Sequence, residues 1–108
     1  MITVIRVKAG QREQHSQKCT DYIGRAFGGW PCSVFHNPFH VGKDGTREDV
    51  IAKFAAYWYA PEQWALRHTA DITIDDDAVL GCWCKPEACH GDIIAGYLNW
   101  KRQEPTLW

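Results

Sequence analysis

The stretch that decides the fold is "AVLGCWCKPEACHGDIIAGYLNWKRQ", Ala78 to Gln103. Its first part, Ala78 to Cys84, is apolar and predicts a buried strand. Pro86 then turns the chain, and apolar residues recur at helical spacing after His90. The stretch therefore predicts a strand, a loop and a helix in succession, which is the unit from which α/β sheets are built.

Three further segments carry secondary-structure signals. The β-branched run "ITVIRV", Ile2 to Val7, predicts a strand. The segment "TREDVIAKFAAYWYA" predicts a helix that begins after Thr46, with Asp49 in the position of a capping box. The segment "PEQWALRHTA" predicts a second, shorter helix that begins at Pro61. The polar residues from Lys8 to Asp21 are expected to form an exposed helix or a loop.

The segment from Tyr22 to Gly45 combines glycines and prolines with aromatic residues. Glycine and proline disfavour regular structure, whereas so many aromatic side chains are not typical of disorder. We therefore expect an ordered loop that lies over the body of the domain. The order of the elements predicts one α/β domain over residues 1–108, with a small, mainly parallel sheet, flanking helices and a Rossmann-like arrangement.

The composition argues against several classes of protein. A formal net charge of −1 gives no overall basic field for nucleic acid or a membrane surface. The chain has no signal-peptide pattern and no apolar run long enough for a transmembrane helix, so we expect a cytoplasmic protein. Thiols stay reduced there and five cysteines is an odd number, so a disulfide framework is not expected. Metal binding and thiol chemistry therefore remain as possible roles for the cysteines.

Three of the cysteines and a histidine lie close together in "GCWCKPEACHGD", Gly81 to Asp92. Side chains alternate along a strand, so Cys82 and Cys84 should share one face. Cys89 and His90 fall at the start of the following helix, where backbone N–H groups and the helix dipole stabilise a thiolate. The motif therefore divides into a strand part and a helix-start part.

This motif has three interpretations. The first is a zinc site with Cys82, Cys84, Cys89 and His90 as ligands, although the spacing is not that of a standard zinc ribbon. The second is a site at the carboxyl end of the strand, where Cys84, Lys85, His90 and the backbone around Ala88 to Gly91 hold an anionic group such as a phosphate. Cys89 or Cys84 would then be the nucleophile and His90 the proton-transfer group. The third is packing, with the cysteines as small buried hydrophobic side chains.

The chain resembles domain-of-unknown-function family 4326, small proteins common in bacteriophages and bacteria. The resemblance rests on "YIGR", on "NPF" followed by "VGKDGTRED", and on "LGCWCKPEACHGDIIAGYL", in this order from Tyr22 to Leu98. The chain departs from the family at His36, where glycine usually precedes Asn-Pro-Phe, and in the expanded segment "AFGGWPCSVF". The residues that match the family's motifs are Gly24, Arg25, Asn37, Pro38, Arg47, Cys82, Cys84, Pro86, Cys89, His90, Gly91 and Asp92.

A more distant resemblance is to unknown-function family 488, which has an early "IG" element and a late strand–Cys–loop–Cys-His–helix element. In that family a glutamate usually stands near the position of Cys84. A four-ligand metal site is then not a shared requirement, and the resemblance favours the ligand site over the zinc site.

These observations predict a pocket at the carboxyl end of the Val79–Cys84 strand, covered by the "YIGR…NPF" loop, that binds a small anionic ligand such as a nucleotide. The predicted ligand-binding residues are Gly24, Arg25, Asn37, Arg47, Gly91 and Asp92, and the predicted catalytic residues are Cys84, Cys89 and His90. Whether a reaction follows is left open. The alternative is a non-catalytic, zinc-bearing interaction module that contacts nucleic acid or a phage or host protein. If the chain is encoded by a phage, its expected location is the cytoplasm of a bacterial host.

Overall fold

The strand–loop–helix unit forms the centre of the molecule. In the computed structural model, which describes residues 1–8 and 19–103, strand β3 spans Val79–Cys82 and helix α3 spans His90–Lys101. Cys89 is the N-cap of α3, and Asp92 completes a capping box with it. The helix therefore begins where the sequence predicts, whereas the strand ends two residues earlier than expected, at Cys82.

The sheet has three parallel strands in the order β1-β3-β2. Strand β1 spans Thr3–Arg6 and pairs with β3 along its whole length. Strand β2 consists of Asp21–Tyr22 alone and pairs with the other edge of β3. Strand β2 was not predicted, because two residues are too few for an alternating pattern to be visible. The pairing with β3 defines this strand. The pairing continues one residue further, where the Ile23 N–H donates to the Gly81 carbonyl at 2.9 Å.

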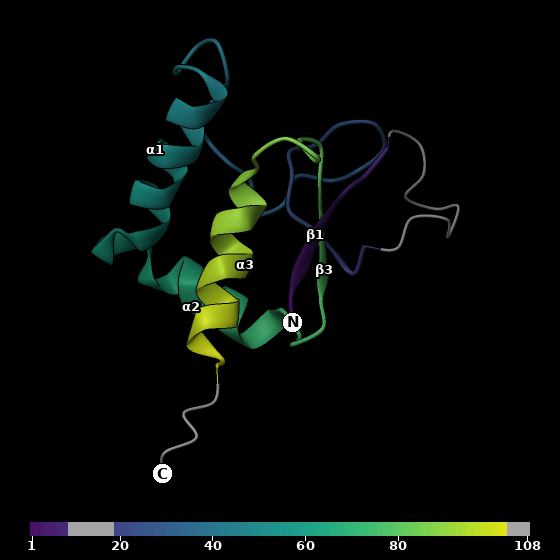
Figure 1. Ribbon diagram of the computed structural model, residues 1–108, viewed down its shortest axis with the longest axis vertical. Helices are drawn as coiled ribbons and strands as arrows, with labels where there is room; N and C mark the ends of the chain where they lie inside the picture. The colour runs from purple at the N-terminus through teal and green to yellow at the C-terminus, as the bar shows by residue number, and fades with distance from the viewer. Residues whose placement is uncertain (9–18, 104–108) are drawn as a thin grey trace.

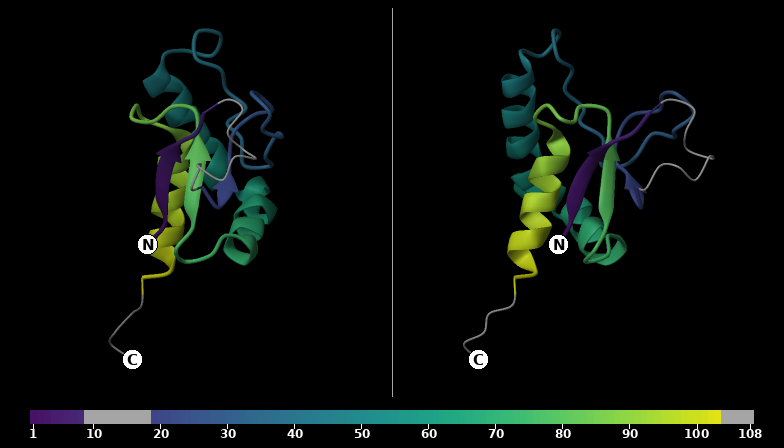
Figure 2. Two further views of the ribbon diagram at one scale, coloured as in Figure 1. Left: turned by 90° about the vertical axis from the view of Figure 1, so that its right-hand side faces the viewer. Right: turned by 45° about the vertical axis from the view of Figure 1, so that its right-hand side comes forward.

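The helices bury the apolar side of this sheet. Helix α3 packs against β1 and β3, and helix α1, Arg47–Tyr59, packs against α3 (Figures 1 and 2). A short 3-10 turn, η1, Pro61–Gln63, leads into helix α2, Trp64–Thr73. The largest fully buried side chains come from the helices, from β3 and from residues that directly follow β2 and α2: Ile23, Phe54, Trp58, Ile74, Leu80, Ile94 and Leu98.

The end of the preceding loop sets the start and the direction of helix α1. Thr46 caps it, accepting the Asp49 N–H at 3.2 Å, while the Asp49 carboxylate accepts the Thr46 N–H at 2.9 Å. Gly45 has a φ of +128°, and a β-carbon there would lie 2.6 Å from that of Asp49. Glycine at this position thus allows the close turn that brings Arg47 to the first position of the helix.

The predicted fold class, α/β with a small parallel sheet and flanking helices, is confirmed. The Rossmann-like arrangement is not confirmed, since the described residues form a single three-stranded sheet and no second half of a doubly wound fold. The prediction for Lys8 to Asp21 falls mostly on residues 9–18, which lie outside the described residues. Across residues 1–8 and 19–103, no helix is long and apolar enough to cross a membrane.

Candidate functional site

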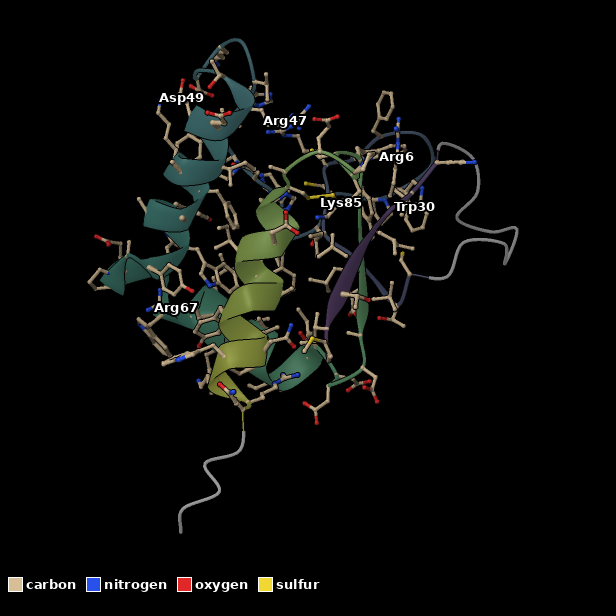
Figure 3. The ribbon with its side chains drawn as sticks, in the orientation of Figure 1. Arg6, Trp30, Arg47, Asp49, Arg67 and Lys85 are labelled. Atoms are coloured by element: carbon tan, nitrogen blue, oxygen red, sulfur yellow. A yellow bond between two sulfur atoms is a disulfide. The ribbon has the colours of Figure 1, made fainter. Side chains whose placement is uncertain are left out.

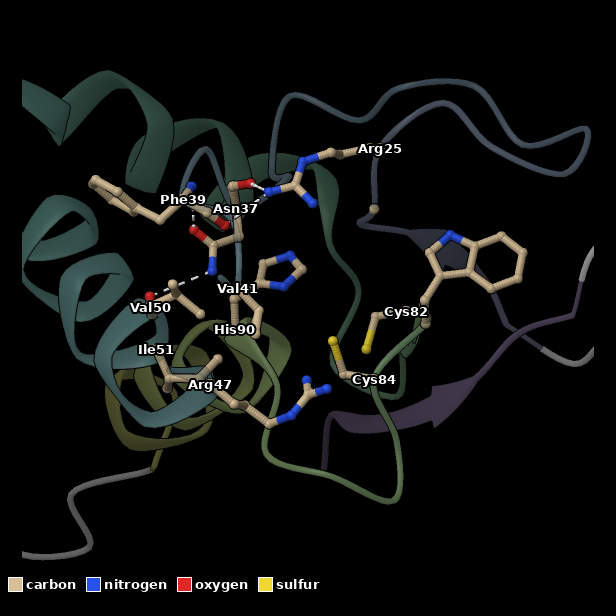
Figure 4. Close-up of a pocket in the computed structure, with 12 residues that line it drawn as sticks. Arg25, Asn37, Phe39, Val41, Arg47, Val50, Ile51, Cys82, Cys84 and His90 are labelled. Atoms are coloured by element: carbon tan, nitrogen blue, oxygen red, sulfur yellow. Dashed lines mark hydrogen bonds between the residues drawn. The ribbon is translucent and has the colours of Figure 1, made fainter. Parts of the chain in front are cut away.

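A pocket lies at the carboxyl end of β3, where ligands bind in many α/β sheets (Figure 4). Its interior volume is about 110 Å³. One wall comes from β3 and the β3–α3 junction, residues 83–89, together with the start of α3. The other wall comes from the covering loop, residues 23–45, and the first turns of α1. The lining residues are Gly24, Arg25, Asn37, Phe39, Val41, Arg47, Val50, Ile51, Cys82, Trp83, Cys84 and His90.

The covering loop is pinned by Arg25. Its Nη2 donates to the carbonyl of Asn37 and, at 2.8 Å, to the carbonyl of Phe39. The Asn37 side chain holds the same turn, because its Oδ1 accepts the Phe39 N–H at 2.9 Å and its Nδ2 donates to the Val50 carbonyl at 3.4 Å. Arg25 and Asn37 therefore shape the wall of the pocket through bonds to backbone carbonyls.

Arg47 differs from Arg25 in its surroundings. It is the first residue of α1 and is half-buried (Figure 3). Its side chain reaches toward Cys84 across the pocket (Figure 4). It makes no hydrogen bond or ion pair with any residue that the structure describes. No carboxylate is among the residues that line the pocket. The Arg47 guanidinium is thus a partly desolvated cation without a counter-charge in the described parts of the chain.

His90 joins the two walls. It is 5 % exposed, and its Nε2 lies 2.8 Å from the carbonyl oxygen of Ile23. Because a carbonyl only accepts, Nε2 carries the proton. Burial lowers the pKa of His90 to about 4, against the raising effect of backbone hydrogen bonds to Ile23 and Phe35, so the ring is neutral at pH 7. Its face also meets the ring of Phe54, with centroids 5.0 Å apart.

The sulfurs of Cys82, Cys84 and Cys89 gather on the β3 side. All three Sγ atoms lie within 4.8 Å of one another, close enough to hold a metal ion. The set does not include His90, whose Nδ1 lies 3.8 Å from the Cys89 sulfur. The zinc site predicted with four ligands therefore appears as a group of three.

Two of these sulfurs also stand at disulfide distance. Cys82 and Cys89 are in direct contact, while Cys19, Cys32 and Cys84 are free among the described residues. No disulfide framework was expected from the sequence; a single pairing is within reach because the β3–α3 junction folds back on the strand. The Cα atoms of the pair are 7.5 Å apart, wider than the usual disulfide range of about 4.4 to 6.8 Å.

Cys89 is fixed by the start of α3. Its sulfur accepts the Gly91 N–H at 3.3 Å, and its own N–H donates to the Asp92 carboxylate at 3.1 Å. Asp92 also forms an ion pair with Lys85 at 2.6 Å. A β-carbon on Gly91 would lie 2.7 Å from Ile23, so glycine here permits close packing of helix on sheet.

The predicted site residues thus fall into two groups. Those that the structure brings to the pocket are Gly24, Arg25, Asn37, Arg47, Cys82, Cys84 and His90. Cys89 is fully buried behind the wall, and Gly91 and Asp92 serve packing and helix capping. Ligand binding by any of them stays a prediction.

Sequence reasoning missed the apolar lining: Phe39, Val41, Val50, Ile51 and Trp83. Val50 and Ile51 carry a helical apolar signal that does not distinguish a core from a pocket wall. Trp83 is held by its Nε1, which donates to the Tyr22 hydroxyl at 2.5 Å, a contact 61 residues apart in the chain. No local pattern predicts such a contact.

Comparisons with known proteins agree with the sequence resemblance. The family model that matches is Domain of unknown function (DUF4326), over residues 5–100. A curated relative, "Uncharacterized 12.4 kDa protein in nrdA-td intergenic region" of Enterobacteria phage T4, is 39% identical over 61 residues, which are 56% of each chain. The chain thus spans about half the length of this relative. No solved structure matches. With nearly its whole length matched, the chain belongs to the DUF4326 family.

Proposed function

We propose that this protein binds a small oxyanion of the phosphate class in the pocket at the carboxyl end of β3. The observation that carries the proposal is Arg47, a half-buried cation on the pocket wall with no partner among the described residues. Arg25 adds a second positive charge on the same wall. An arginine fork matches the oxygens of a phosphate or carboxylate, so an anion between the two side chains would offset their partial desolvation.

The size of the pocket favours a ligand as small as a phosphate over a drug-sized molecule. A volume of about 110 Å³ is below the several hundred Å³ typical of pockets for drug-sized ligands. A phosphate-sized anion suits it, whereas a whole nucleotide would have to extend outside. The expectation of a nucleotide finds no support in the comparisons, and the proposal is limited to the oxyanion.

Binding is better supported than catalysis. Cys84 lines the pocket and is the accessible candidate nucleophile, whereas Cys89 is fully buried. Burial holds the pKa of His90 at about 4, which makes its ring a weak base at neutral pH. The catalytic roles predicted for these three residues therefore stay outside the proposal.

The test is a titration of inorganic phosphate into reduced, chelator-treated protein, followed by ³¹P NMR or calorimetry. We expect Arg47→Gln to weaken phosphate binding at least tenfold, because the variant removes the unpartnered charge. Lys43→Gln is the matched control, since Lys43 is an exposed cation that does not line the pocket. Equal affinities in wild type and Arg47→Gln would rule the proposal out. Native mass spectrometry of freshly purified protein would identify an anion that co-purifies.

A second candidate is the non-catalytic zinc module, in which a metal stabilises a surface for nucleic acid or a protein. The group of three sulfurs supports its metal component. Metal analysis of purified protein tests it: about one zinc per chain, lost in Cys82→Ser and Cys89→Ser, is the expected result. Both candidates are assigned to the cytoplasm of a bacterial host, which the phage relative supports and where thiols remain reduced.

A further inference from the structure

The sulfurs of Cys82, Cys84 and Cys89 lie close enough together to share one metal ion. Zinc–sulfur bonds of about 2.3 Å in a tetrahedron place sulfurs roughly 3.8 Å apart. The three Sγ atoms lie within 4.8 Å of one another, and the sulfurs of Cys82 and Cys89, which are in direct contact, would separate to admit an ion between them. The 7.5 Å between the Cα atoms of Cys82 and Cys89 fits a bridge through a metal better than a direct bond.

The described residues supply three ligands, and zinc in proteins takes four. His90 is not the fourth, because neither of its ring nitrogens lies within 4.8 Å of all three sulfurs. A carboxylate is not available either, since none lines the pocket. The fourth ligand must therefore come from outside the described residues.

The direction of that fourth position follows from burial. Cys89 is fully buried at the start of α3, whereas Cys82 and Cys84 line the pocket (Figure 4). An ion held by all three sulfurs has Cys89 on its inner side, so its remaining position opens toward the space that Arg25 and Arg47 also face.

We propose that a zinc-type ion on Cys82, Cys84 and Cys89 takes the bound oxyanion as its fourth ligand, so that metal and arginines form one site. This inference rests on the proposed function, since it names what the oxyanion contacts. Three thiolates and a divalent ion carry a net charge of about −1, and the two arginines bring the site to about +1. A metal-coordinating oxyanion such as phosphate suits that charge.

Metal and anion then strengthen each other's binding by the same factor, because the coupling between two ligands is reciprocal. The ligand class is accordingly narrowed to small oxyanions that coordinate a divalent metal. Cys84 has the role of a metal ligand in this arrangement, rather than that of a nucleophile.

Cobalt(II) is the probe, since its thiolate complexes absorb visible light and respond to a change of ligand. Full-length protein is reduced with a phosphine, loaded with cobalt and titrated with inorganic phosphate. We expect a thiolate-type cobalt spectrum, a change in that spectrum on adding phosphate, and phosphate affinity at least tenfold higher than in metal-free protein.

Variants separate the parts of the site. Cys84→Ser should lose the cobalt spectrum, and Cys32→Ser, which alters an exposed cysteine outside the group, should keep it. Arg47→Gln should bind cobalt as wild type does and lose the response to phosphate. Circular dichroism of each variant establishes that it is folded.

The outcomes distinguish this inference from the proposed function. If cobalt does not bind, or binds without any spectral response to phosphate, the shared site is wrong, while phosphate binding by metal-free protein still upholds the proposed function. If phosphate binds neither metal-free nor cobalt-loaded protein, both are wrong. If phosphate binds only when cobalt is present, the shared site holds and the arginines alone are insufficient.

Discussion

The two walls of the pocket are built in different ways. The β3–α3 wall comes from one short stretch, in which a parallel strand ends at Cys82 and a capped helix begins at His90. The covering-loop wall depends on bonds between distant residues, with Arg25 holding the carbonyls of Asn37 and Phe39. A wall made of regular elements has its own internal support, whereas a loop wall is only as stable as the contacts that hold it.

The largest expected effect is at the residue that joins the walls. His90→Ala removes the hydrogen bond to the Ile23 carbonyl and leaves a cavity beside Phe54. The unsatisfied carbonyl and the cavity together should lower the free energy of unfolding by about 4 kcal/mol in urea denaturation. The exposed His68→Ala is the control and should stay within about 0.5 kcal/mol. A loss below about 1 kcal/mol would mean that the walls are not coupled through His90.

The burial of His90 also predicts that the stability of the protein depends on pH. In the unfolded chain His90 binds its proton with a pKa of 6.5, and in the folded protein with a pKa of about 4. The folded state therefore binds fewer protons, and stability is full above pH 6.5 and falls as the pH drops toward 4. The difference between the two values corresponds to about 3 kcal/mol.

Urea denaturation at several pH values, on reduced and chelator-treated protein, measures this loss. In His90→Gln the loss between pH 6.5 and 4 should largely disappear. The carboxylates of Asp44 and Asp49 do not mimic the effect, because backbone hydrogen bonds lower their pKa values below 3.8 and their contribution is lost at more acidic pH. A His90→Gln variant with the full pH dependence would contradict the assignment.

A smaller effect separates the two arginines. Arg25→Ala removes two charge-assisted hydrogen bonds from the covering loop and should cost about 2 kcal/mol of stability. Arg47→Ala should change stability by less than about 0.5 kcal/mol, since Arg47 has no partner among the described residues. Thermal denaturation of both variants, without added anion, makes the comparison. Equal losses would show that Arg47 is held as firmly as Arg25.

A smaller loss than that of Arg25→Ala is expected in the β3–α3 wall. Asp92→Ala removes the acceptor for the Cys89 N–H and the ion pair with Lys85, and should cost about 1 kcal/mol in urea denaturation. Glu87→Ala, an exposed change in the same junction, is the control and should be close to neutral. A loss above about 3 kcal/mol would show that this wall depends on a single cap and lacks the support of its strand and helix.

The local elements of the fold could be predicted because their signals are local. The caps at Thr46 and Cys89 are residue types at fixed distances from the residues they serve, and both helices begin where these signals place them. The sequence also pointed to Arg25, Arg47, Cys84 and His90, which the structure brings to one pocket. The grouping of Cys82 with Cys84 was expected from strand alternation, although β3 ends at Cys82 and the turn after it completes the group.

Only the tertiary structure decided which groups surround each of the site residues. Only pairing with β3 makes Asp21–Tyr22 a strand. The packing of α3 on the sheet buries His90, and this burial lowers its pKa. The same packing places the Ile23 carbonyl against its Nε2, and the ring lies outside the sulfur group. The sequence by itself determined the elements, their caps and the chemistry available. Contacts between residues far apart in the chain decided which groups are neutralised, which are committed to structure and which remain for a ligand, because burial and hydrogen bonding are properties of the folded surroundings.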